Sequence, residues 1–176
     1  MLFLPLPIPG AFVIEIEPHS DERGFFARSW SAGEFRNRGL NETVAECSIS
    51  LNPRSGTLRG LHYQAAPHEE AKLVRCTRGA AFDVLVDVRP HSAAFRQFAA
   101  VTLTADNHKS VYIPEGCAHG FQTLQNDTEL WYQISHPHTP DQAFGVRWND
   151  PAFGIPWPSP PALISQRDAT FPDFQG

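Results

Sequence analysis

The sequence predicts an all-β protein, and three observations support this. Sixteen prolines and twelve glycines in 176 residues punctuate short apolar runs with tight turns. The periodicity of a long helix is hard to find, whereas several runs alternate between apolar and polar residues. In residues 81–88 (AFDVLVDV), Asp83, Leu85 and Asp87 fall on one face, and Phe82 and the valines fall on the other. Such alternation is expected where a barrel wall separates two environments.

Six strands and one helix follow from this pattern. Each strand is a short apolar run between turn-forming residues, and the clearest are 12–16, 72–76, 81–88, 99–104, 110–113 and 129–135. Residues 32–38 (AGEFRNR) indicate one short helix. The Pro-rich and aromatic stretch 150–176 should wrap the barrel as ordered loop, because Trp148 and Trp157 favour packing over disorder.

Length and composition predict one globular domain over residues 1–176. A hydrophobic content of 41% is ordinary for a chain with a sizeable core, and no repeat or linker divides the sequence. The N-terminal residues MLFLPLPIPGA contain no basic segment and three prolines, which argues against a signal peptide. Because no later stretch has about 20 uninterrupted apolar residues, we expect a cytoplasmic location.

Charge and cysteine content exclude further classes of function. A net charge of -5 offers no general attraction to nucleic acid or to an anionic membrane surface. Cys47, Cys76 and Cys117 are odd in number and lack CxxC spacing, which argues against a disulfide framework or a structural zinc site. We therefore expect free, buried thiols.

Two of the eight histidines have distinctive surroundings. His62 lies in TLRGLHYQ, close to Gly60 and Arg59, and His119 lies between glycines in IPEGCAHGF. From local sequence, either could be functional or a structural core histidine. A metal site is disfavoured, because the one His-x-His pair, His136 and His138, lies in a proline-flanked loop and His62 has no ligand set on one strand face.

Eight sequence blocks resemble the dTDP-4-dehydrorhamnose 3,5-epimerase family. They occur in the family's order over nearly the whole chain: DERGFF (21–26), TLRGLHYQ (57–64), AKLVRC (71–76), FDVLVD (82–87), IPEGCAHGF (113–121), WYQ (131–133), WNDPAFGIPWP (148–158) and SQRDATFP (165–172). The resemblance implies a double-stranded β-helix, or cupin jelly roll, with short peripheral helices. It also implies a homodimer that binds a nucleotide-diphosphate sugar and uses no cofactor.

The resemblance also implies a catalytic set. His62 would remove a proton beside the sugar ketone, with Asp168 of the Ser-x-x-Asp motif orienting its imidazole. Tyr132 would return a proton from the opposite face, and Lys72 would support the charge that develops on the keto oxygen. Without the resemblance, Asp168 would be a loop carboxylate or helix cap, Tyr132 a barrel-lining residue and Lys72 a solvated strand residue.

Further positions match substrate-binding residues of the family. Arg23, Arg59 and His119 match residues that hold the diphosphate and neighbouring sugar groups, a role suited to the donors of arginine. Phe26 fits an apolar wall of the same pocket. Arg167 replaces a family lysine beside the catalytic aspartate and keeps the positive charge.

The departures from the family pattern cluster at nucleotide recognition. Arg28 stands where the family commonly has glutamate, and Glu46, Cys47 and Ser48 replace a Gln-x-Asn segment. His138 replaces a base-stacking tyrosine, and a family glutamate is Ala143. A change from carboxylate to arginine reverses hydrogen-bonding character, so thymidine is favoured by family frequency, with cytidine or guanosine as alternative carriers.

Three alternatives to a 3,5-epimerase remain open at this point. A mono-epimerase of C3 or C5 would use the same side chains. A metal-dependent cupin oxygenase or isomerase would require bound metal. A non-catalytic sugar-nucleotide binding module would need no opposed acid and base, so the complete set of His62, Asp168, Tyr132 and Lys72 counts against it.

Overall fold

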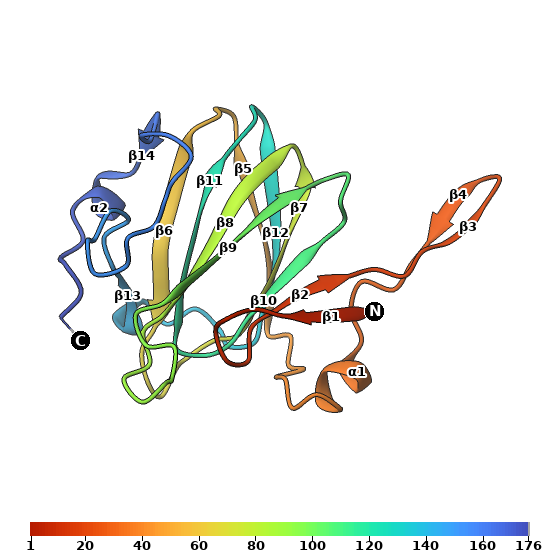
Figure 1. Ribbon diagram of the computed structural model, residues 1–176, viewed down its shortest axis with the longest axis horizontal. Helices are drawn as coiled ribbons and strands as arrows, with labels where there is room; N and C mark the ends of the chain where they lie inside the picture. Colours follow the sequence, from red (N-terminus) through yellow and green to blue (C-terminus); the bar gives the residue numbers. More distant parts are fainter. Residues whose placement is uncertain (176) are drawn as a thin grey trace.

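The structure, a computed structural model, describes residues 1–175 and shows two facing β-sheets with short helices at their edges (Figure 1). The first sheet has the strand order β1-β2-β10-β7-β12-β5. Its strands are β1 (Leu2–Pro5), β2 (Phe12–Glu15), β5 (Glu46–Asn52), β7 (Lys72–Arg78), β10 (Ser110–Ile113) and β12 (Thr128–Ile134). The strands pair antiparallel throughout this sheet.

The second sheet has the order β13-β6-β11-β8-β9, with β14 added parallel to β6. Its strands are β6 (Thr57–Gln64), β8 (Ala80–Asp87), β9 (Phe98–Thr104), β11 (Cys117–Thr123), β13 (Ala143–Gly145) and β14 (Leu163–Ile164). The two sheets face each other as the walls of a jelly roll (Figure 1). The expected all-β double-stranded β-helix is therefore confirmed.

The barrel interior is a core to which both sheets contribute. Val74, Ile113 and Leu130 from the first sheet pack with Leu85 and Phe121 from the second, and all five side chains are buried. On β8, the alternating side chains divide as the sequence predicts. Leu85 faces this core, whereas Val84, Val86 and, just after the strand, Val88 join a separate apolar cluster on the outer face of the second sheet.

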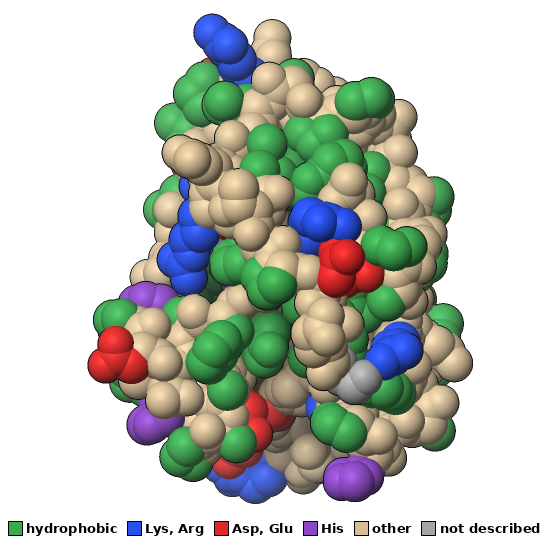
Figure 2. All heavy atoms as spheres, turned by 90° about the vertical axis from the view of Figure 1, so that its left-hand side faces the viewer, with side chains coloured by type: hydrophobic (Ala, Val, Ile, Leu, Met, Phe, Trp, Pro, Cys, Tyr) green, Lys and Arg blue, Asp and Glu red, His purple; other side chains and the backbone are tan. Residues whose placement is uncertain are grey.

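The C-terminal segment covers that outer face. Phe153 is buried in the outer cluster, and Trp157 packs on Phe82 while its indole N–H donates to the main-chain oxygen of Trp148 at 2.8 Å. Figure 1 shows this segment in blue along β6, and Figure 2 views the same side, where apolar and charged side chains are interspersed. The expected wrapping is confirmed over residues 150–175. The segment also contains β14 and the helix α2 (Gln166–Ala169), which the sequence does not predict.

The N-terminal elements lie at the other end of the molecule. The helix α1 (Ala32–Arg36) buries Phe35 against Tyr112 of the first sheet. It ends before residue 38, where the sequence places its end, because Asn37 is the C-cap and Gly39 adopts a positive φ of 69°. A hairpin of β3 (His19–Asp21) and β4 (Gly24–Phe26) projects away from the barrel (Figure 1).

The remaining expectations concern cysteines and membrane segments. All three cysteines are free, and Cys76 and Cys117 are buried as expected. The expectation is wrong for Cys47, which is exposed because it lies on β5, the edge strand of the first sheet. Among the helices of residues 1–175, none has the length and apolar character needed to cross a membrane.

Candidate active site

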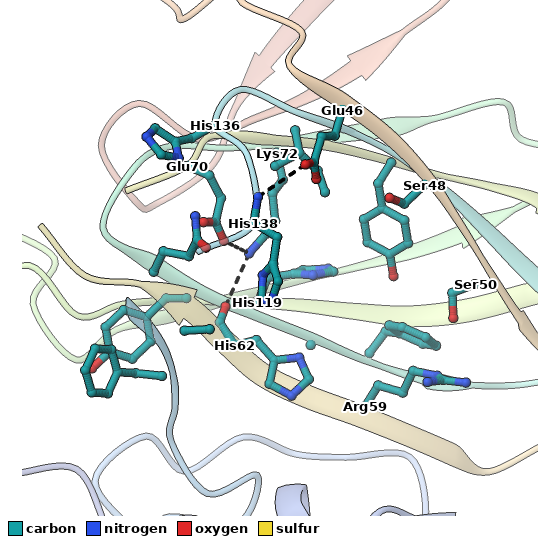
Figure 3. A pocket seen from close by; sticks show the side chains of 18 of the residues that line it. Glu46, Ser48, Ser50, Arg59, His62, Glu70, Lys72, His119, His136 and His138 are labelled. Atoms are coloured by element: carbon teal, nitrogen blue, oxygen red, sulfur yellow. Dashed lines mark hydrogen bonds and ion pairs between the residues drawn. The ribbon is translucent and has the colours of Figure 1, made fainter. Parts of the chain in front are cut away.

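A cavity of about 350 Å³ lies between the two sheets, where the edge strand β5 meets β6. Polar side chains from both walls line it, including His62 and Arg59 of β6, Lys72 of β7, His119 of β11 and Tyr132 of β12. Figure 3 shows several of these residues converging on one space from different strands. Residues far apart in the sequence therefore face a common cavity.

His62 forms a hydrogen-bonded dyad with Asp168. Its Nε2 lies 2.8 Å from Oδ1 of Asp168, and Oδ2 of the same carboxylate accepts from the main-chain N–H of Gly60 at 3.0 Å. Asp168 is 5% exposed, whereas 43% of the His62 side chain is exposed. The dyad thus consists of a buried carboxylate behind an accessible imidazole.

The surroundings of Asp168 keep it ionised. Burial would raise the pKa of this carboxyl, but hydrogen bonds from His62 and the Gly60 N–H outweigh burial and hold the pKa below its ordinary value. Because a carboxylate can only accept, Nε2 of His62 must donate, which leaves the lone pair on Nδ1. His62 can therefore accept a proton as a general base.

Two local sequence features shape the backbone around the dyad, a glycine on β6 and a serine at the start of α2. Gly60 has a φ of 117°, and a Cβ at this position would lie 2.6 Å from Cα of Gly120 on β11. The absence of a side chain thus permits the close approach of the β6 and β11 backbones. On the other side, Ser165 caps α2 by accepting from the Asp168 N–H at 3.1 Å, which fixes the start of the short helix.

A second His–Asp pair lies deeper in the cavity. Nε2 of His119 is 2.8 Å from Oδ2 of Asp83, and both residues are buried. The His119 ring packs edge-on against Tyr132, with centroids 6.0 Å apart. Burial raises the pKa of the Tyr132 hydroxyl, and the negative charge of Asp83 raises it further. Tyr132 therefore holds its proton at neutral pH, as a proton donor must.

Lys72 supplies positive charge next to the base. Its Nζ lies 2.7 Å from Oε1 of Glu70 and donates to the main-chain oxygen of His62 at 3.4 Å, as the dashed lines of Figure 3 show. The Lys72 side chain is largely buried, and Oε2 of Glu70 is buried with no partner among the described residues. The ammonium is therefore held at a defined point of the cavity wall rather than solvated.

Other predicted residues fall into two groups. Ser48, Arg59, His138 and Arg167 line the cavity, and Nε of Arg59 donates to Asn52 at 2.8 Å. Four others are not among the lining residues within 1–175: Arg23, Phe26, Arg28 and Cys47. Arg23 and Phe26 lie on the projecting hairpin, 84% and 80% exposed, respectively. Arg28 follows the hairpin and lies 3.9 Å from Glu34.

Sequence reasoning missed several side chains of the site. The partners Asp83, Glu70 and Asn52 were not assigned roles, and neither was the cavity residue His136. An aspartate within the apolar run AFDVLVDV was a usable signal, because a buried carboxylate requires a partner. Within residues 1–175, no three His, Cys, Asp or Glu side chains gather in an arrangement that could hold a metal ion.

Comparisons with known proteins agree with the geometry. The family model for dTDP-4-dehydrorhamnose 3,5-epimerase matches residues 5–176. A dTDP-4-dehydrorhamnose 3,5-epimerase of Sinorhizobium fredii is 37% identical over 99% of this chain and 90% of its own length. The crystal structure of the Elizabethkingia anophelis epimerase matches with a TM-score of 0.96 and 33% identity, covering 99% of this chain and 96% of the other.

One further solved structure was crystallised with a sugar nucleotide. The 3,5-epimerase from Legionella pneumophila, in complex with dTDP-4-keto-L-rhamnose, matches with a TM-score of 0.89 and 31% identity. The match covers 99% of each chain. The similarity therefore extends over the whole barrel and the C-terminal segment.

Proposed function

Because this chain belongs to the dTDP-4-dehydrorhamnose 3,5-epimerase family and is an epimerase of a dTDP-linked 4-keto-6-deoxysugar, we propose that His62 and Tyr132 are its base and acid. One observation supports this most directly. The His62–Asp168 dyad and the protonated Tyr132 face one cavity from β6 and β12, which belong to different sheets. Base and acid on opposite walls are what inversion requires, since the proton leaves one face of the ring and returns to the other.

The reaction begins with removal of a proton from a carbon beside the ketone. His62 Nδ1 takes the proton from C3 or C5, the C–H electrons form the enolate, and negative charge moves to the C4 oxygen. Asp168 stabilises the imidazolium through its hydrogen bond to Nε2. The Lys72 ammonium stabilises the enolate oxygen, which is the point where charge develops.

Inversion follows when the enolate is protonated on the opposite face. Tyr132 donates its hydroxyl proton to the carbon, the carbonyl re-forms, and the configuration at that carbon is reversed. Solvent then returns a proton to Tyr132 and accepts one from His62, which restores both groups. We propose that C3 and C5 react in turn, and that Arg59 and Arg167, which line the cavity, bind the diphosphate.

The position of the hairpin supports a homodimer. Arg23 and Phe26 project from the barrel and lie outside the cavity of their own chain (Figure 1). They can meet a substrate only in a second copy, which would receive the hairpin at its cavity mouth. The exposed apolar side chains Leu2 and Leu4 of β1 and Ile49 of β5 suit contact with such a copy.

Action in the cytoplasm stays a prediction from the sequence.

Mixed dimers test whether the hairpin crosses. We expect Arg23→Ala and His62→Ala each to inactivate the site to which they contribute. If the hairpin serves the partner's site, refolding an equal mixture restores about a quarter of wild-type activity, because half of the dimers then contain one intact site. No recovery in a mixture that light scattering shows to be dimeric would contradict the crossing hairpin.

Deuterium incorporation tests the function itself. The protein is incubated in heavy water with dTDP-4-keto-6-deoxyglucose and, in parallel, with its CDP counterpart, and NMR follows C3 and C5. We expect exchange and inversion at both carbons of the dTDP-sugar, and none in His62→Ala. Exchange at one carbon would indicate a mono-epimerase, and faster reaction of the CDP-sugar would contradict the thymidine assignment. No exchange with either, in folded protein, would contradict the proposed function.

A further inference from the structure

His62 has a third neighbour besides Asp168 and Lys72. The ring of Phe171 packs edge-on against the imidazole, with centroids 5.9 Å apart and the planes at 74°. Phe171 follows Asp168 by three residues, directly after Thr170, the C-cap of α2. The same short segment therefore brings both a carboxylate and an aromatic ring to the base.

The space that Phe171 occupies exists because residue 145 is glycine. Gly145 of β13 pairs in register with His62 of β6. A Cβ on Gly145 would lie 2.3 Å from both Cε2 and Cζ of the Phe171 ring, far inside van der Waals contact. Any side chain at this position would force the ring to move, whereas the strand could stay in place. The glycine thus admits the ring beside the imidazole.

Phe171 also contacts Arg167. The guanidinium carbon of Arg167 lies 5.6 Å from the ring centroid, and Nη2 of Arg167 donates to the main-chain oxygen of Ala143 at 3.3 Å. The ring therefore lies among the arginine, the glycine of β13 and the imidazole. Among the described residues, Phe171 is not one that lines the cavity.

From this geometry we infer that Phe171 is a positioning residue for His62, and that its place beside the imidazole depends on Gly145. The hydrogen bond to Asp168 fixes the position of Nε2, but it still allows the imidazole ring to turn about the axis of that hydrogen bond. The edge of Phe171 blocks that rotation, so that Nδ1 stays aimed at the substrate carbon. Because Phe171 acts through His62 and not on the sugar, its loss should affect the chemical step more than substrate binding.

The inference rests on the proposed base, and a double-mutant cycle tests it separately. Phe171→Ala should lower kcat by about 10- to 100-fold with KM changed by less than about 3-fold, since misplacing a reacting group by about 1 Å can cost about 100-fold. Gly145→Ala, which displaces the ring, should lower kcat in the same direction. The double variant should be no slower than Phe171→Ala alone, because no ring is left to displace.

A matched control comes from the same C-terminal segment. Phe174 packs on Phe153 and Phe95 with centroids 5.5 and 5.9 Å apart, away from His62. Phe174→Ala should keep kcat within about 3-fold of wild type if the contact of Phe171 with His62, and not general packing of the segment, positions the base.

Three outcomes would overturn the inference in a protein whose wild type is active. These are wild-type kcat in Phe171→Ala, an equal loss in Phe174→Ala, or independent, multiplicative losses from Gly145→Ala and Phe171→Ala. An inactive wild type would instead refute the proposed function. Thermal unfolding of each variant identifies any loss of activity that reflects unfolding.

Discussion

Asp168→Asn should disable the base while changing the size of the side chain very little. The Gly60 N–H can be satisfied only if the new amide turns its oxygen towards Gly60. The NH2 group then faces Nε2 of His62, which must become an acceptor and pass its proton to Nδ1. His62 would therefore present an N–H, and not a lone pair, to the substrate carbon.

The expected loss follows from two contributions. Removing a charge-assisted hydrogen bond from the imidazolium costs about 1.5–3 kcal/mol, which corresponds to about 10- to 150-fold in rate. The wrong tautomer adds to this loss, and the corresponding change in a serine protease lowers kcat about 10⁴-fold. We therefore expect kcat for Asp168→Asn to fall between about 10²- and 10⁴-fold.

The assay is the rate of deuterium incorporation at C3 and C5 in heavy water. Ser165→Ala is the matched control, because it removes the cap of α2 and costs about 1 kcal/mol of stability, but it leaves the carboxylate in place. Its kcat should stay within about 10-fold of wild type. If Asp168→Asn kept kcat within about 3-fold of wild type, or if Ser165→Ala lost as much, the tautomer argument would be wrong.

Four further predictions concern the acid, the cation, the backbone and pH. Tyr132→Phe should lower inversion more than deuterium exchange in the NMR assay, since the base still removes and returns protons on its own face; equal losses would contradict the acid role. Lys72→Met should lower kcat by about 10²-fold in the same assay, because the enolate loses a cation, and an unchanged kcat would exclude that role. Gly60→Ala should lower the free energy of unfolding by more than about 2 kcal/mol in urea, because its Cβ would meet the backbone of Gly120; an unchanged midpoint would refute this. Burial opposes ionisation of Asp87, but hydrogen bonds from Arg89 and Ser92 hold its pKa below the ordinary value. The stabilisation of the folded state by the ionised Asp87 carboxylate is therefore complete above the unfolded pKa of about 4 and is lost as the pH falls through the folded pKa. The melting temperature should consequently fall less steeply below pH 4 in Asp87→Asn than in wild type.

The strands that sequence reasoning found are those with one apolar face. Residues 110–113 form β10 as predicted, and 81–88 differs from β8 by one residue at each end. The strands β5 and β6 were not predicted, because their cavity-facing positions carry polar residues such as Ser48, Arg59 and His62. A strand that lines a binding cavity does not show the apolar alternation of a strand that faces a core.

The contacts between the residues of the site could not be predicted from the local sequence pattern alone. His62 and Asp168 are 106 residues apart, and no local spacing indicates that they meet; the family resemblance supplied that pairing. The pairing of Lys72 with Glu70 is local, but it depends on how the chain turns before β7. The place of Arg23 and Phe26 on a projecting hairpin depends on tertiary structure, which a one-dimensional pattern does not contain.

The late position of Asp168 in the chain has a consequence for synthesis. The residues that fill the barrel interior, from Ile8 to Leu130, leave the ribosome before the segment that contains Asp168 and Phe171. A nascent chain can therefore enclose its core and present His62 while that histidine still lacks its carboxylate and its aromatic neighbour. Premature termination between β12 and α2 would yield a chain in which His62 lacks the carboxylate that orients it and the cavity lacks Arg167.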